Sequence, residues 1–125
     1  MNLREPRVRA KLERAFRDGV MVGISTIALF ELWHGISKST QRANNVQQLA
    51  AFLALGLEQW PFEAKDAEDA GDIRASLERA GTTIGPYDLL IAAQARRRGV
   101  VLITANSREF ARVPGLKSED WSLDS

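Results

Sequence analysis

Short apolar runs alternate along the chain with longer segments in which apolar residues recur at helical spacing. Residues 20–24 and residues 100–103 are almost entirely apolar, and each run directly follows a glycine. Runs of this length that are apolar on both faces are typical of buried strands in a parallel sheet. Residues 57–61 alternate apolar and polar positions up to Pro61, so they predict a third strand.

The amphipathic segments between these runs predict helices. They cover residues 5–18, 26–36, 46–55, 62–80, 86–98 and 107–111. Pro6 and Pro86 stand at first helical positions, where proline is favoured. Ser25 or Thr26 is placed to cap the second helix. Residues 37–45 predict a turn or a loose helical segment, and the chain after the last helix shows little regular pattern.

Strands and helices therefore alternate throughout, without internal repeats or a low-complexity linker. This order predicts an α/β fold of three layers, with a mostly parallel central sheet flanked by helices. With 125 residues, 45% hydrophobic and 26% charged, the chain has the size and composition of one globular domain over residues 1–125. No apolar run approaches the ~18 residues of a membrane span, and residues 1–10 are too charged for a signal peptide, so we expect a cytoplasmic protein.

The composition limits the chemistry that the chain can perform. It has no cysteine and one histidine, His34, which excludes disulfides, thiolate catalysis and histidine-rich metal sites. Any metal must therefore be held mainly by oxygen, which favours Mg²⁺ or Mn²⁺. The net charge of +1 conceals clusters, because residues 96–98 are consecutive arginines and residues 63–72 are acidic. The first helix carries a row of cations that indicates a solvated face or, alternatively, an RNA contact: Arg7, Lys11, Arg14 and Arg17.

Glu31 lies in the apolar stretch of residues 24–36, between Phe30 and Leu32. A carboxylate next to a buried apolar stripe is unfavourable unless a metal ion or an arginine binds it. Alternatively, Glu31 lies at the edge of the stripe and reaches water. His34 could reach the edge of a site, with a packed or surface position as the alternative.

Two further acidic residues are expected near the carboxyl ends of the strands, where open parallel sheets bind their ligands. Asp88 falls in the first turn of the helix after Gly85, and Glu109 falls in the short helix after residues 100–103. The carboxylates of Glu31, Asp88 and Glu109 would repel one another if they met there, and a divalent cation would remove that repulsion. Alternatively, Asp88 interacts only with the helix dipole, and Glu109 forms a capping box with Asn106.

Three stretches carry a resemblance to a known family. They are ELWHG within residues 25–35, IGPYDLLIAAQA at residues 84–95 and LITANSREFARVPGL at residues 102–116. In order and spacing, over essentially all 125 residues, the chain resembles the PIN-domain ribonucleases, in particular the VapC-type toxins of bacterial toxin–antitoxin pairs. The resemblance implies a PIN-like α/β fold and endonucleolytic cleavage of RNA that depends on Mg²⁺ or Mn²⁺. It also implies an antitoxin partner that blocks this activity.

The resemblance implies roles for individual residues. Glu31 and Asp88 match the family's second and third acidic metal ligands. Glu109 stands where the family commonly has Asp before Phe, so it would bind metal directly or through water. One or two ions held by these three catalytic residues would activate a water for phosphodiester hydrolysis. The residues implied to steady the site are Ser25, Thr104 and Asn106.

The chain departs from the family at its start. Family members begin with a hydrophobic strand that ends in Asp-Thr-Asn or similar, whose Asp is the first metal ligand. Here residues 2–7 already resemble the segment before the next helix. No Asp upstream of Glu31 has the setting of that first ligand, since Asp18 lies beside the Gly19 turn. Loss of that strand would leave backbone N–H and C=O groups of the sheet without hydrogen-bond partners. Either the start is internal to a longer gene product, or the chain is a degraded, inactive copy; we expect the first.

Competing hypotheses follow from these patterns. A metal-dependent endoribonuclease would contact the RNA backbone through arginines that otherwise form solvated helix ends: Arg96, Arg97, Arg98, Arg108 and Arg112. A catalytically incomplete PIN-like module would only bind antitoxin or RNA. A phosphatase or response-regulator-like domain ranks last, because it also needs an Asp after its first strand. Four apolar residues could pack in the core or form a groove for an antitoxin helix or a homodimer: Phe30, Trp33, Phe52 and Leu53.

Overall fold

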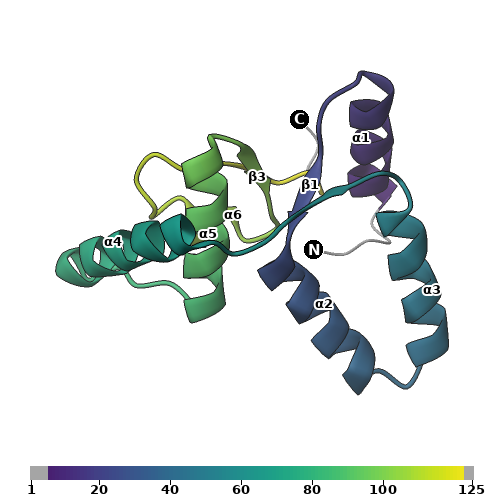
Figure 1. Ribbon diagram of the computed structural model, residues 1–125, viewed down its shortest axis with the longest axis horizontal. Helices are drawn as coiled ribbons and strands as arrows, with labels where there is room; N and C mark the ends of the chain where they lie inside the picture. The colour runs from purple at the N-terminus through teal and green to yellow at the C-terminus, as the bar shows by residue number, and fades with distance from the viewer. Residues whose placement is uncertain (1–5, 123–125) are drawn as a thin grey trace. The chain divides into compact units, whose positions relative to one another are not determined.

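The computed structural model describes residues 6–122 of the chain. The predicted helix start at Glu5 and residues 2–5 of the family-like segment lie outside this range. The chain divides into two compact units, an N-terminal unit that ends at Pro61 and a C-terminal unit that begins at Phe62 (Figure 1).

The N-terminal unit contains three helices and one pair of strands among its described residues (Figure 1). Their bounds are α1 Pro6–Arg17, β1 Gly23–Ser25, α2 Thr26–Lys38, α3 Arg42–Leu53 and β2 Glu58–Trp60. The two strands are parallel, with Gly23 opposite Glu58 and Ser25 opposite Trp60. The buried apolar residues of this unit are Val8, Leu12, Ile24, Ile36 and Leu49.

Ser25 is both the last residue of β1 and the N-cap of α2. Its buried hydroxyl oxygen accepts hydrogen bonds from the backbone N–H groups of Ile27 (3.0 Å) and Ala28 (3.3 Å). Because the first N–H groups of a helix have no partner within the helix, this cap allows α2 to begin where the strand ends. The predicted cap is confirmed, with Ser25 rather than Thr26 as the capping residue.

The predicted strand at residues 20–24 is wrong in its first half. Val20 and Met21 are 55% and 77% exposed, and the strand runs over Gly23–Ser25 instead. The partner strand β2 is equally short and stops before Pro61, which has no N–H group to extend the ladder. Apolar content alone therefore placed the strand too early.

Residues 37–45, predicted as a turn or a loose helical segment, are mostly helical, since α2 and α3 leave only residues 39–41 between them. The Ser39 hydroxyl accepts hydrogen bonds from the Gln41 N–H (3.0 Å) and from the Asn45 side-chain amide (2.9 Å). Such local side-chain bonds replace the helix bonds that are lost where the chain reverses. Figure 1 shows the two helices joined by this short connection.

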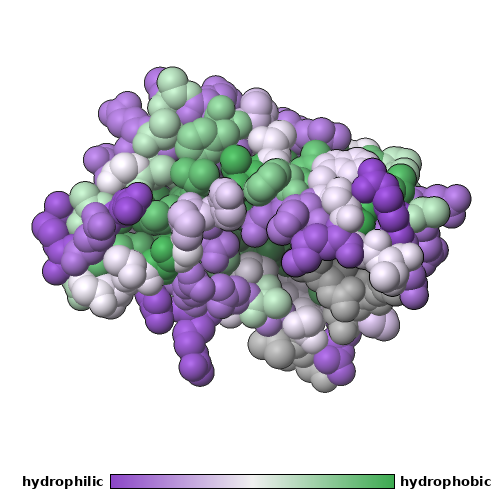
Figure 2. Space-filling model, turned by 90° about the horizontal axis from the view of Figure 1, so that it is seen from below, coloured by the Kyte–Doolittle hydropathy of each residue, from purple (hydrophilic) through white to green (hydrophobic). Residues whose placement is uncertain are grey.

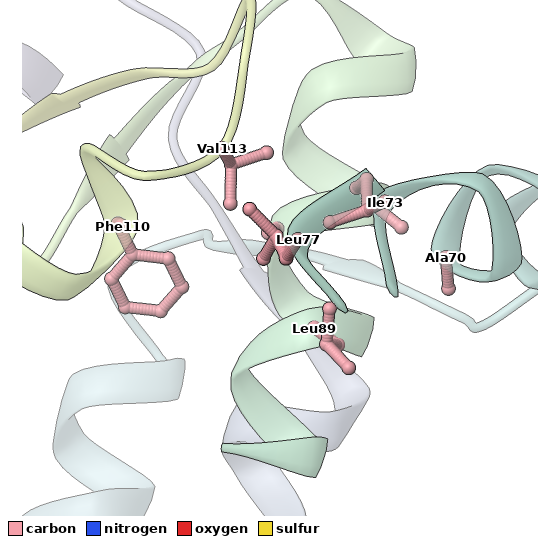
Figure 3. Packing of buried hydrophobic residues seen from close by; sticks show 8 residues of the cluster. Ala70, Ile73, Leu77, Leu89, Phe110 and Val113 are labelled. Carbon is pink, nitrogen blue, oxygen red and sulfur yellow. The ribbon is translucent and has the colours of Figure 1, made fainter. Parts of the chain in front are cut away.

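The C-terminal unit is built on α4 and α5, which pack against each other. The bounds of its elements are α4 Ala64–Ala80, α5 Pro86–Arg98, β3 Val101–Ile103, α6 Ser107–Phe110 and β4 Lys117–Glu119. In the core, Ile73 and Leu77 of α4 lie near Leu89 of α5, with Phe110 and Val113 beside them (Figure 3). The remaining members of this cluster are Ala70, Ala92 and Ala93.

The helix α5 has the bounds that the sequence predicts. Pro86 occupies its first turn, and Gly99 ends it with φ of 66°, in the left-handed region that favours glycine. Both signals are local to the chain, which is why the sequence identifies this helix well.

The strand β4 was not predicted, because the sequence shows little regular pattern after residue 113. Its residues Lys117–Glu119 are polar, and they pair in parallel with β3, Val101 opposite Lys117 and Ile103 opposite Glu119. The Thr104 N–H extends the ladder by donating to the Glu119 carbonyl at 2.9 Å. The backbone holds this strand, and therefore hydropathy does not reveal it.

The α/β class with parallel pairing is confirmed. Among residues 6–122 the strands form two parallel pairs, β1 with β2 and β3 with β4. No helix within the described residues is long and apolar enough to cross a membrane. On the face shown in Figure 2, apolar side chains are interspersed with polar ones.

Candidate metal centre

Asp88 lies in the first turn of α5 and is partly buried. Gly85 precedes the helix with φ −59° and ψ 148°, an extended conformation that is also suited to the residue before a proline. The helix starts at Pro86, so the fixed geometry of this turn determines where the Asp88 carboxylate is presented. The predicted position of Asp88 at a helix N-terminus is confirmed.

Glu109 is fixed from both sides by hydrogen bonds. Its Oε1 accepts from the backbone N–H of Gly85 at 2.7 Å, and its Oε2 accepts from the side-chain amide of Asn106 at 2.6 Å. The Asn106 backbone N–H donates to Thr104 Oγ1 at 2.9 Å, so the alternative in which Glu109 caps that N–H is wrong. Thr104 therefore fixes Asn106, and Asn106 in turn binds Glu109 of α6.

Asp88 and Glu109 come together at the start of α5. A Cβ built on Gly85 would lie 3.6 Å from Asp88 Oδ2 and 3.7 Å from Glu109 Oε1, so both carboxylates lie beside Gly85. The Gly85 N–H and then the Asn106 amide lower the pKa of Glu109, against the effect of partial burial. Two carboxyl groups in contact are stable when a proton or a cation lies between them.

The donor set fits a hard divalent cation. Both carboxylates offer only oxygen, and each Glu109 oxygen uses one of its two acceptor positions in the bonds to Gly85 and Asn106. The remaining acceptor positions suit a divalent cation that prefers oxygen ligands. Among residues 6–122, no group of three or more His, Cys, Asp or Glu residues is clustered to hold a metal.

Glu31 belongs to the N-terminal unit, in the middle of α2, and its side chain is exposed. Its part in the metal site therefore stays a prediction. On the same helix, Phe30 and His34 stack with their ring centroids 6.5 Å apart, and both residues are exposed. Core packing is wrong for Phe30 and Trp33, which are 50% and 41% exposed.

The three consecutive arginines at the end of α5 bind acidic residues of α4 within the same unit. Arg96 pairs with Asp69 through two bonds, of 2.6 and 3.1 Å. Arg97 and Arg98 both donate to Oδ1 of Asp66, at 2.6 and 3.0 Å. These ion pairs hold the three arginines within the unit, and their predicted contacts with RNA stay a prediction.

Asp66 is fully buried and lies at the centre of this ion-pair cluster. Burial alone would raise its pKa, but hydrogen bonds from Arg97, from the Glu63 backbone N–H and from Arg98 lower the pKa to about 2. The sequence showed both charge clusters but not their pairing, because α4 and α5 meet only in the folded chain.

Arg108 and Arg112 remain candidates for contacts with RNA, since both are exposed. Arg112 donates to the Thr83 carbonyl at 2.9 Å and contributes to the low pKa of Glu109 by electrostatic attraction.

The sequence gave no sign of the Gly85 N–H as a partner of Glu109, because a backbone donor is common to almost every residue type.

The fold and the acidic pair define an α/β domain with a candidate metal centre made of oxygen ligands. The chain belongs to the PIN-domain family, and the match to the PIN domain covers residues 2–116, in both units. Among curated proteins it is similar to the tRNA(fMet)-specific endonuclease VapC of Shigella flexneri, with 41% identity over 99 residues, 79% of this chain and 74% of that protein. The protein of the same name from Salmonella typhimurium is 44% identical over 98 residues, 78% of this chain and 74% of the relative.

Solved structures give the same family. The chain is similar to VapBC2 from Rickettsia felis bound to a DNA fragment from their promoter, with a TM-score of 0.84 and 39% identity over 90% of this chain and 84% of that one. DNA-bound VapBC from Salmonella typhimurium has a TM-score of 0.82 and 39% identity, over 92% and 84% of the two chains. The PIN-like fold expected from the sequence motifs is therefore confirmed.

Proposed function

We propose that this protein is a metal-dependent endoribonuclease and the toxin of a toxin–antitoxin pair. The placement of Asp88 and Glu109 beside Gly85 carries the proposal, because two neighbouring carboxylates with oxygen donors only are suited to a divalent cation. Relatives with at least 41% identity over more than three quarters of the chain are named VapC endonucleases. The two units would act as one PIN domain over residues 1–125, in keeping with a family match that spans both.

In this proposal Glu31, Asp88 and Glu109 hold Mg²⁺ or Mn²⁺. A divalent ion bound there would supply a water of lowered pKa and would stabilise charge on the phosphate. The protein's own contribution is positional: the Gly85 N–H and the Asn106 amide orient the Glu109 carboxylate, and the first turn of α5 orients Asp88. The absence of cysteine fits a mechanism without a side-chain nucleophile.

The partner that we propose is a cognate antitoxin. The similar solved structures are complexes named VapBC, and two of them contain DNA. The exposed aromatic side chains of Phe30 and Trp33 on α2 are candidates for this contact, because aromatic residues are enriched in protein interfaces. A homodimer stays a prediction.

The test combines calorimetric titration with Mg²⁺ or Mn²⁺ and cleavage of RNA, with tRNA(fMet) as the first substrate because two relatives act on it by name. Asp88→Asn and Glu31→Gln should each abolish cleavage and weaken metal binding. Asp72→Asn is the matched control, since Asp72 is an exposed acidic residue of α4, and it should leave both properties unchanged. If the unaltered protein binds no divalent metal and cleaves no RNA, the proposal fails and a binding module is the better description.

A further inference from the structure

The helix α1 carries a concentrated positive charge. Five cationic residues and one acidic residue give Pro6–Arg17 a formal charge of +4, although the whole chain carries only +1. Four of the cations follow one another at spacings of four, three and three residues, which places them on one side of the helix. We call this set the basic stripe, and its members are Arg7, Lys11, Arg14 and Arg17.

We propose that the basic stripe binds the phosphate backbone of the RNA substrate. This inference rests on the proposed ribonuclease function, and it assigns the contact with the RNA backbone to a surface other than the arginine cluster of α5. The reaction itself requires only the carboxylate site, so the basic stripe would contribute to affinity for RNA rather than to the chemical step.

Two of the stripe's charges, those of Arg14 and Arg17, are available to a ligand. Arg14 and Arg17 are exposed, and within the part of the chain that the structure describes neither has an ion-pair partner. The one acidic residue of α1, Glu13, forms an ion pair with Arg9 at 3.7 Å. Arg9 lies on a different side of the helix from the basic stripe. The stripe itself has no acidic member, and the nearest carboxylates are those of Glu13, four residues before Arg17, and Asp18, four residues after Arg14.

The arginines of α5 provide the contrast. Arg96, Arg97 and Arg98 are held at 2.6–3.1 Å by Asp66 and Asp69. Their side chains are 16–28% exposed, whereas Arg9 on α1, which is ion-paired, still has 62% of its side chain exposed. Three arginines in a row are the stronger signal in the sequence, but the fold uses them internally and leaves Arg14 and Arg17 of α1 exposed to solvent.

An RNA backbone suits this surface better than a protein does. The apolar residues of α1 face inward, with Val8 and Leu12 buried, so the exposed side offers charge without an apolar anchor. Protein interfaces depend on buried aromatic and apolar anchors, whereas contacts to phosphates need cations on flexible side chains. From Arg7 to Arg17 the stripe extends about 15 Å along the helix, enough for several phosphates of one strand.

The test is the salt dependence of RNA binding in EDTA, where no metal-dependent cleavage occurs. The full chain is compared with the double variant Arg14→Gln/Arg17→Gln, with tRNA(fMet) as the RNA probe. Removing two phosphate contacts should reduce the slope of log K against log salt by about 1.4 for single-stranded and about 1.8 for duplex regions. Arg9→Gln is the matched control on the same helix, and its slope should equal that of the unaltered protein.

The possible results separate this inference from the proposed function. A smaller slope for the stripe variant, together with an unchanged slope for Arg9→Gln, supports the inference. Equal slopes for all three proteins overturn it, and if the unaltered protein still cleaves RNA in Mg²⁺, the proposed function stands. If the unaltered protein neither binds nor cleaves RNA, both fail. Retained RNA binding with lost affinity for an antitoxin would assign the stripe to a protein partner and overturn the inference.

Discussion

The C-terminal unit contains two acidic sites that are built in opposite ways. Asp66 is fully buried, and two arginines and a backbone N–H balance its charge inside the protein. Asp88 and Glu109 both lie beside Gly85, and the groups that donate hydrogen bonds to Glu109 are neutral amides. The first site is complete without a ligand, whereas the second concentrates negative charge that a cation can balance. Balanced charge indicates a structural role, and unbalanced charge in a rigid setting indicates a functional one.

The largest expected effect is on catalysis and concerns Glu109→Gln. We expect cleavage of RNA to fall at least about 100-fold, since even groups that only orient a metal ligand contribute 10–100-fold. The free energy of unfolding should change by less than about 1 kcal/mol, because the amide can still accept the Gly85 hydrogen bond. Cleavage assays and urea unfolding measure the two quantities. A large loss of stability would place Glu109 in the same class as Asp66.

The next effect is on stability and concerns Asp66→Asn. Removing one partner from a buried ion pair leaves charges uncompensated, and we expect the free energy of unfolding to fall by about 3 kcal/mol. Glu63→Gln is the control, because Glu63 has 54% of its side chain exposed, and its loss should be below about 1 kcal/mol. Metal affinity of the folded fraction should not change in either variant. A metal defect in Asp66→Asn would remove the distinction between the two sites.

Asp66 also predicts an acid-dependent loss of stability. Its pKa is lowered from 3.8 to about 2 in the folded protein, so the unfolded chain binds a proton more readily between these values. The stabilisation, about 2 kcal/mol, is therefore complete above pH 4 and is lost as the pH falls towards 2. Urea unfolding at a series of pH values measures this slope. The slope should be smaller in Asp66→Asn, and identical slopes in both proteins would contradict the assignment.

The smallest effect concerns the backbone N–H of Gly85. Gly85→Pro keeps φ near −59°, which proline adopts, but it removes the hydrogen bond to Glu109 Oε1. We expect metal affinity to fall about tenfold, in the range found for partners of metal ligands. Gly85→Ala keeps the N–H, and its Cβ would make ordinary contacts at 3.6 and 3.7 Å, so its affinity for metal should stay close to that of the unaltered protein. Equal affinities in both variants would show that this bond does not position Glu109.

Features with a local cause could be predicted from the sequence. Pro86 and Gly99 define α5, Ser25 caps α2, and these signals are visible in a few residues of sequence. Features whose cause lies elsewhere in the chain could not be predicted. The pairing of Asp66 with Arg97 depends on how two helices pack, and the Gly85 bond to Glu109 comes from a backbone group that every residue except proline possesses. The acidic residues themselves could be named in advance, but the groups that hold them in position could not.

The polar strand β4 has a consequence for the loop that precedes it. Pairing of Val101–Ile103 with Lys117–Glu119 closes residues 104–116 into a ring of chain whose ends are joined by backbone hydrogen bonds. A closed segment has far fewer accessible conformations than an open one, and the entropy is lost when the strand pairs. Glu109 lies within this ring, so much of the conformational entropy lost when Glu109 is ordered is already lost during folding. A metal ion that binds there meets a carboxylate whose freedom has already been restricted.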